Sequence, residues 1–324
     1  MRVVYRASGI RVASQSPTIG STLMSITIAI LGPGAMGSAV ARRLGDHGAH
    51  VLTSLTGRSE ATVQRAAAAG MVAVSEADIA AADIILSIVP PAEAVALARR
   101  LAVAVSERGT TPIVVDCNAV NVATVEQIAA IVAPSGARFV DAAIIGLPPK
   151  PGTRRPTFYV CGEHAGGLAV LRDLGLDLRV VAGPIGAASA LKMSYAGVNK
   201  GLTALGAAIA IAATRAGAAQ ALRDELAESQ PQILARFAVA LPDMLPKAYR
   251  WVAEMREIAG FLGPDDPANL IFEGAARLFE HIASEQDEGG KDIAHKDIAH
   301  KDIDHRDIDH ILAFAEMARQ PSKS

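Results

Sequence analysis

A glycine-rich segment directly after a short apolar run is the feature that most constrains the fold of this chain. Residues 26–31 read ITIAIL and residues 32–37 read GPGAMG, which fits the spacing G-x-G-x-x-G. Between a strand and a helix, this pattern is typical of the turn that binds the diphosphate of a dinucleotide. A glycine-rich turn without a ligand is the structural alternative.

Each glycine of the motif has a physical role in such a turn. Gly32 permits the tight turn, Gly34 lets the backbone approach the diphosphate, and Gly37 lets helix and sheet pack closely. The amides of Ala35, Met36 and Gly37 are expected at the helix N-terminus, where free N–H groups and the helix dipole favour an anion.

Beyond this turn, continuously apolar strands alternate with helices. This order predicts a Rossmann-type, doubly wound parallel sheet that is buried on both faces. The expected strands are residues 26–31, 50–54, 84–89, 113–116, 138–142 and 157–161, and the expected helices are 38–44, 62–69, 92–107 and 123–132.

After Gly186 the signals are helical only, and a chain of 324 residues favours two domains. We expect an NADP-binding domain over residues 26–185 and a helical substrate and dimerisation domain over 186–324. Residues 1–25 lack the apolar run of a secretory signal, and we expect a disordered extension, with an organelle transit peptide as the alternative.

The segment after the second strand indicates which dinucleotide is preferred. Residues 54–59 read SLTGRS, and no acid occurs between Asp46 and Glu60 to accept from the ribose hydroxyls of NAD. Arg58 and Ser59 are predicted to bind the 2′-phosphate, so NADPH is preferred and NAD less so. An ordinary surface arginine is the alternative reading.

Charge and cysteine content exclude several classes of function. The formal net charge is -2, and no aromatic residues are interleaved with basic ones, so neither nucleic acid nor an acidic membrane is expected as a partner. Cys117 and Cys161 form no disulfide framework and are expected to be buried thiols. Lys200 and Arg215 flank the apolar stretch 202–213 too closely for a membrane span, and we expect a cytoplasmic location.

Residues 291–310 form a four-fold pentapeptide repeat, KDIAHKDIAHKDIDHRDIDH. One hypothesis is a metal site that uses His295, His300, His305 and His310. On a helix, however, five residues advance roughly 140° net, so the four histidines form no single stripe. A solvated or disordered segment without a metal is the preferred interpretation.

Several segments together resemble the β-hydroxyacid dehydrogenase family, which includes 3-hydroxyisobutyrate and phosphogluconate dehydrogenases. The resemblance runs from residue 26 to about 205 and is carried by ILGPGAMG, Val89-Pro90 after IILSI, VVDCN at 114–118, DAAIIG at 141–146 and GPIGAASALK at 183–192. The segments ALKMSYAGVNKG and PDMLPKAYRWVAEM look like a divergent branch with its own phosphogluconate-dehydrogenase-like C-terminal domain. The resemblance implies that Val89 and Pro90 contact the cofactor.

Lys192 matches the family's general acid/base, which stands on the first interdomain helix. Hydride transfer makes or consumes an alkoxide-like oxygen, and a nearby cation stabilises that charge and relays the proton. Lys192 lies within the small, apolar stretch ASALKMSYAG, where a buried cation needs a reason. A solvent-facing helix lysine is the alternative.

The substrate-binding residues depart from the family pattern. Ile145 replaces the serine of the loop that holds a substrate carboxylate, beside Gly146, and Ala196 replaces an asparagine that normally follows the lysine by four residues. The apolar loop at residues 144–149 therefore favours a bulkier, less charged substrate than a simple hydroxy acid.

Other residues are candidates for the missing contacts. Asn199 lies about 20° from the helix face of Lys192 and Tyr195 about 60° from it, so either is predicted to bind a substrate oxygen, with helix packing or capping as the alternative. Asn118 follows a strand end, where the nicotinamide side of the crevice is expected, and is predicted to contact cofactor or substrate.

The sequence as a whole predicts an NADPH-preferring oxidoreductase that acts on a carbonyl or hydroxyl of a small molecule. Imine reduction is a rival, but enzymes of that class typically replace the lysine. A non-catalytic NADP sensor or structural dimer is a second rival. The long helix expected at residues 187–216 is rich in Ala, Gly and Leu and exposes apolar surface, which predicts a homodimer through the C-terminal helices.

Overall fold

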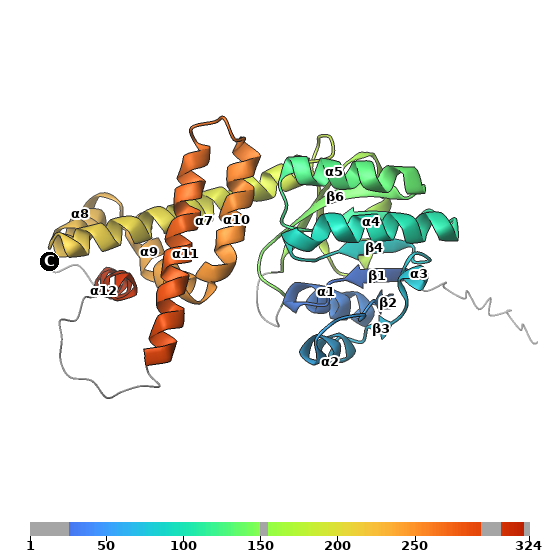
Figure 1. Ribbon diagram of the computed structural model, residues 1–324, viewed down its shortest axis with the longest axis horizontal. Helices are drawn as coiled ribbons and strands as arrows, with labels where there is room; N and C mark the ends of the chain where they lie inside the picture. Colours follow the sequence, from blue (N-terminus) through green and yellow to red (C-terminus); the bar gives the residue numbers. More distant parts are fainter. Residues whose placement is uncertain (1–25, 150–154, 293–305, 321–324) are drawn as a thin grey trace, which may run out of the picture.

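The computed structural model describes residues 26–149, 155–292 and 306–320. A sheet flanked by helices forms one part of the molecule and a group of helices forms the other (Figure 1). The extension predicted for residues 1–25 lies outside the described residues. Of the repeat at 291–310, the structure describes residues 291–292 and 306–310.

One mixed sheet carries the first part, in the order β3-β2-β1-β4-β5-β6-β7-β8. Every neighbouring pair is parallel except β6 and β7. The predicted Rossmann-type doubly wound fold is therefore confirmed, with one antiparallel pair near its edge. The strands are β1 (Thr27–Leu31), β2 (His50–Thr53), β3 (Val72–Ala73), β4 (Ile84–Ser87), β5 (Ile113–Asp116), β6 (Arg138–Ile145), β7 (Thr157–Cys161) and β8 (Asp177–Val180).

Helices bury both faces of this sheet. On β1, Ile28 and Ile30 enter the core under α1, α2 and α6, while Ala29 and Leu31 enter the core under α3, α4 and α5, because successive side chains of a strand point to opposite faces. The helices are α1 (Ala35–Asp46), α2 (Glu60–Ala68), α3 (Glu76–Ile79), α4 (Pro91–Arg108), α5 (Val122–Val132) and α6 (Val170–Asp173), with 3-10 turns η1 (Ala133–Ser135) and η2 (Glu163–Leu168).

The second part is all-helical and has its own apolar core. Its elements are α7 (Ala187–Arg215), α8 (Ala219–Ser229), α9 (Pro231–Met244), η3 (Leu245–Lys247), α10 (Ala248–Leu262), α11 (Asn269–Asp292) and α12 (Asp307–Arg319). Figure 1 shows α7 running from the sheet through the length of the helical part. A Cβ on Gly206 of α7 would lie 2.5 Å from the ring of Phe237, so the small residues of α7 allow α9 to pack closely.

By length and composition, α7 is also the one helix of the described residues that is apolar enough to cross a membrane. That finding is weak, because the core helix of a soluble protein passes the same test. In the structure, Met193, Ala207 and Ile211 of α7 belong to the buried core of the helical part.

Candidate active site

The glycine-rich turn between β1 and α1 has the geometry that its sequence predicts. Gly32 has φ +98°, and a Cβ there would lie 2.2 Å from the carbonyl oxygen of Ile88. A Cβ on Gly37 would lie 2.2 Å from the carbonyl oxygen of Gly32, whereas a Cβ on Gly34 would meet nothing within 4 Å. Gly32 and Gly37 are thus required by packing, and Gly34 leaves open space beside the backbone.

The start of α1 can accept an anion. The helix begins at Ala35, no side chain caps it, and its first turn, which includes Met36 and Gly37, contains no acid. The hydroxyl of Ser38 donates to the Gly34 carbonyl at 2.6 Å and fixes the turn. Free N–H groups and the positive end of the helix dipole therefore face the space beside Gly34. This cradle fits a diphosphate.

Two arginines follow β2, and one of them contacts this turn. Arg58, which follows β2, forms an ion pair with Glu93 of α4 at 3.2 Å, and Ser59 is the N-cap residue of α2. Arg65 on α2 donates to the Pro33 carbonyl at 3.3 Å, a contact that the sequence analysis missed. No local sequence pattern marks Arg65 as a residue that contacts this turn.

Asp141 of β6 ties the sheet to α7. Its carboxylate is fully buried and accepts from the amides of Gly186 at 3.0 Å, Ala188 at 3.2 Å and Ser189 at 3.1 Å. The Ser189 hydroxyl donates to it at 2.8 Å and the Cys161 thiol at 3.2 Å. A carboxylate at a helix N-terminus satisfies free amides and the dipole, so Asp141 fixes where α7 begins.

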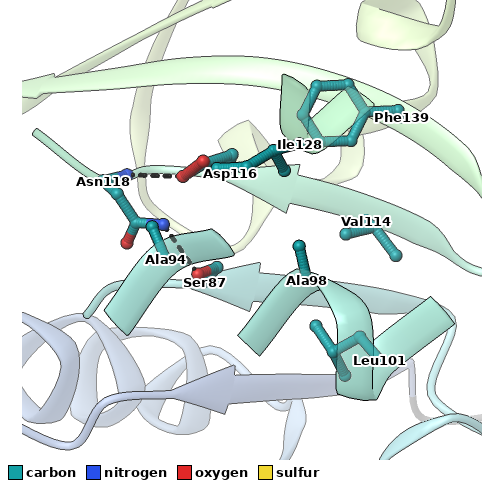
Figure 2. A pocket seen from close by; sticks show the side chains of 9 residues that line it. All are labelled: Ser87, Ala94, Ala98, Leu101, Val114, Asp116, Asn118, Ile128 and Phe139. Carbon is teal, nitrogen blue, oxygen red and sulfur yellow. Dashed lines mark hydrogen bonds between the residues drawn. The ribbon is translucent and has the colours of Figure 1, made fainter. Parts of the chain in front are cut away.

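The last residue of β5, Asp116, is a second buried carboxylate. One oxygen accepts from the Asn118 amide at 2.9 Å (Figure 2), while Oδ2 is buried and has no hydrogen-bond partner among the described residues. Burial raises the pKa of Asp116 to about 7, and the charge of Asp141 adds to this, while the Asn118 amide and Lys192 act in the opposite direction. An isolated buried carboxylate is costly unless it is protonated or meets a cation.

The side chain of Asn118 holds the neighbouring loop together. Its oxygen accepts from the Val89 amide at 2.7 Å, and its Nδ2 donates to the Ser87 hydroxyl at 2.9 Å (Figure 2). Val89 is buried, and Pro90 is the N-cap residue of α4. Asn118 thereby orients the Val89-Pro90 turn at the ends of β4 and β5.

Lys192 lies in the second turn of α7, six residues after Gly186. It is partly buried, and its ammonium group makes no hydrogen bond or ion pair with any described residue. Burial lowers the pKa of Lys192, whereas the nearby Cys117, Asp116 and Asp141 act to raise it. A lysine with a lowered pKa and no fixed partner can both hold and release a proton.

Both thiols are buried and free, as predicted. Burial and the charge of Asp141 raise the pKa of Cys161 to about 11, and burial also raises the pKa of Cys117 above its ordinary value. Both groups therefore remain protonated thiols. Neither has the thiolate character that a nucleophile or a metal ligand requires.

Further along α7, the two residues predicted to bind a substrate oxygen, Tyr195 and Asn199, differ in exposure and hydrogen bonding. Tyr195 is 54% exposed, whereas Asn199 donates to the Tyr195 carbonyl at 2.9 Å and accepts from Arg236 at 2.8 Å. Arg236 was missed by the sequence analysis, and so was Lys200, since no local pattern distinguishes them from surface cations.

Lys200 is held by residues of α10. It forms an ion pair with Glu254 and lies 5.2 Å from the ring centre of Trp251. Burial lowers the pKa of Lys200 to about 7, with further contributions from Lys192 and Arg250.

The loop after β6 begins with an apolar residue and a turn that requires glycine. Ile145, the last residue of β6, is partly buried. Gly146 has φ +131°, and a Cβ there would lie 2.9 Å from Pro156 Cα. The backbone thus requires glycine at this position whatever binds beside it.

Known proteins share both parts of the chain. Residues 27–166 match the family model described as the NAD binding domain of 6-phosphogluconate dehydrogenase, and residues 213–282 match a domain of unknown function, DUF1932. No curated protein matches the chain.

Solved structures of similar proteins cover nearly the whole length. A conserved protein of unknown function, reported as structurally similar to 3-hydroxyacid dehydrogenases, is 27% identical with a TM-score of 0.65 over 82% of this chain and 99% of its own. A conserved hypothetical protein from Sinorhizobium meliloti is 26% identical, with a TM-score of 0.66 over 91% and 97%. The 3-hydroxyisobutyrate dehydrogenase of Mycobacterium tuberculosis shares the fold at 20% identity, with a TM-score of 0.54 over 92% and 100%.

Proposed function

Because the chain belongs to the 6-phosphogluconate dehydrogenase-like NAD(P)-dependent oxidoreductases and carries a DUF1932 domain, we propose that it is an NADPH-preferring reductase or dehydrogenase. It interconverts a carbonyl and a hydroxyl group of a small molecule, and Lys192 is the general acid/base.

The environment of Lys192 carries this proposal. The partly buried ammonium of Lys192, which has no hydrogen-bond partner in the part of the chain that the structure describes, lies near two buried carboxylates. These are Asp116, at the carboxyl end of β5, and Asp141, in β6. In open sheets of this type, ligands bind beyond the carboxyl ends of the strands. A lysine ammonium at this edge can stabilise the negative charge that develops on an alkoxide-like oxygen.

The mechanism divides the work between cofactor and chain. The turn at residues 32–37 would hold the diphosphate, and the bound nicotinamide would supply or accept the hydride. In reduction, Lys192 donates a proton to the substrate oxygen, and in oxidation it removes that proton. Asp141 keeps the first turn of α7 in place, so Lys192 stays positioned.

The preference for NADPH rests on Arg58, Ser59 and Arg65. The guanidinium of Arg58 pairs with Glu93 in the first turn of α4, and Arg65 of α2 contacts the glycine-rich turn. A 2′-phosphate between these arginines gains charge-assisted hydrogen bonds that the hydroxyl of NAD cannot match.

The same structure supports expectations about substrate and assembly. Ile145 and the apolar loop up to residue 149 favour a less charged substrate than a simple hydroxy acid, with Tyr195, Asn199 and Asn118 as candidate contacts. Val198, Leu205 and Ile209 form an exposed apolar stripe on α7, which favours a homodimer through the C-terminal helices. A cytoplasmic enzyme fits these features.

Oxidation of NADPH should be measured over a set of aldehydes, keto acids and imines, with Lys192→Ala alongside. The proposal expects turnover of at least one carbonyl compound and its loss in the variant. Turnover of imines alone would favour an imine reductase. Tight NADPH binding without any turnover would favour a non-catalytic sensor.

A further inference from the structure

A cluster of three side chains joins α11 to α12 at the far end of the helical part, away from the sheet (Figure 1). His281 and Glu285 stand four residues apart on α11, and Asp307 is the first residue of α12. One ligand atom from each lies within 4.8 Å of the other two. Asp307 also belongs to the last unit of the pentapeptide repeat, residues 306–310.

From this geometry we propose that His281, Glu285 and Asp307 bind a divalent transition-metal ion of the zinc class. The site lies outside the proposed active site and is independent of it. Its role is structural, since it connects α11 to α12 across the chain segment 293–305.

The distances fit the coordination shell of such an ion. His281 Nε2 lies 3.0 Å from Asp307 Oδ2 and 3.2 Å from Glu285 Oε1. Bonds of about 2.0 to 2.2 Å around one ion place neighbouring ligand atoms roughly 3.0 to 3.5 Å apart. The two printed separations thus match those of neighbouring ligand atoms around one ion, and the third lies within 4.8 Å. Imidazole with two carboxylates favours zinc-class ions over Mg²⁺ or Ca²⁺, which prefer oxygen ligands only.

Further hydrogen bonds and an ion pair orient the two carboxylates, and Glu285 Oε1 both accepts a backbone amide and lies beside His281. Arg215 pairs with Asp307 through Oδ1 at 2.6 Å, so Oδ2 faces the histidine. Glu285 accepts from the Asp307 amide at 3.3 Å and the Ile308 amide at 3.2 Å. Such outer hydrogen bonds fix ligands in known metal sites.

Charge and exposure agree with the proposal. With a neutral imidazole, the two carboxylates and Arg215 sum to one negative charge, which attracts a cation. The side chain of Asp307 is 7% exposed, whereas that of His281 is 52% exposed, so the ion is reachable and water can complete its coordination. Because Glu285 also caps α12, we expect micromolar affinity, weaker than in closed four-ligand sites.

Calorimetric titration of the full-length, chelator-treated protein with ZnCl₂ tests this site. The repeat contains other histidines, so the matched control is the triple variant His295→Ala/His300→Ala/His305→Ala. We expect one equivalent to bind with micromolar affinity in both the wild type and the triple variant. His281→Ala should weaken that binding at least about tenfold.

Folding and metal type are checked in the same preparations. Circular dichroism should show an unchanged fold for His281→Ala, whose side chain is half exposed, and Asp307→Asn serves as a second ligand variant. Visible absorption of added Co²⁺ should appear in the wild type and vanish in His281→Ala, and Mg²⁺ should not compete. Wild-type affinity in His281→Ala, binding that disappears only in the triple variant, or no binding by the wild type would overturn the proposal.

Discussion

The two ends of the proposed crevice are built in different ways. At the diphosphate end, six consecutive residues form the whole cradle, and backbone geometry determines its function, since a Cβ on Gly32 or on Gly37 would lie only 2.2 Å from a carbonyl oxygen. At the Lys192 end, residues from β5, β6 and α7 meet, and buried charge determines the function. The first end depends on shape and the second on electrostatics.

This difference teaches what each end can tolerate. A backbone cradle is lost when a methyl group fills its space, whatever the charge. A buried charge cluster is altered by neutral substitutions that leave its shape intact. Matched substitutions at the two ends therefore separate binding of the cofactor from proton transfer.

The largest expected effect is at Lys192. Lys192→Ala should lower kcat by about 10²- to 10⁴-fold, because general acid/base catalysis contributes that much, while the Kd for NADPH changes little. Steady-state kinetics and fluorescence titration measure the two quantities. Lys247→Ala, on an exposed ion pair far along the chain, is the control. Activity within tenfold of the wild type would remove Lys192 from the mechanism.

Asp116→Asn should change how stability depends on pH. The pKa of Asp116 is raised from 3.8 to about 7 in the folded state, so its contribution is fully present below pH 4 and is lost as the pH rises through 7. The variant has no titrating carboxyl at this position. As the pH rises from 5 to 8, its free energy of unfolding should therefore increase by about 2 to 3 kcal/mol relative to that of the wild type. Urea unfolding at both pH values measures this.

The same substitution should also affect the kinetics. The charge of Asp116 acts to raise the pKa of Lys192, so its removal lowers that pKa further, and the acid limb of the oxidation rate should move to lower pH. Exposed Asp46→Asn is the control and should alter neither profile. An unchanged kinetic profile in Asp116→Asn would show that the two groups are not coupled.

Gly34→Ala tests the diphosphate end. The φ of Gly34 is -72° and a Cβ there meets nothing within 4 Å, so the variant should fold normally. It should nevertheless bind NADPH about 10- to 100-fold more weakly, because the methyl group fills the space that the diphosphate needs. Gly45→Ala, later in α1 and equally open, should leave the Kd unchanged. Equal affinities for the two variants would contradict the cradle.

The smallest predicted effect concerns cofactor preference. Arg58→Ala should reduce the ratio of kcat/KM for NADPH over NADH by about tenfold, since one charge-assisted contact to the 2′-phosphate is lost. Arg100→Ala, which breaks a comparable exposed pair with Glu76, should leave the ratio unchanged. A higher ratio for NADH in the wild type would already refute the preference.

The sequence predicts features formed by consecutive residues better than features formed by residues far apart in the chain. The glycine turn, most strands of the sheet and the position of Lys192 come from local patterns. Two strands were missed, because β3 has only two exposed residues and β8 contains two charged ones. The capping of α7 by Asp141, 45 residues before Gly186, and the pairing of Asn118 with Val89 depend on long-range contacts that no local pattern contains.

A crystal structure with bound NADP⁺ tests the central claim most directly. The account predicts the diphosphate against the amides of Ala35 and Met36, with the Lys192 ammonium directed at the space beside the nicotinamide. Cofactor bound elsewhere, or a Lys192 side chain pointing into bulk solvent, would contradict it.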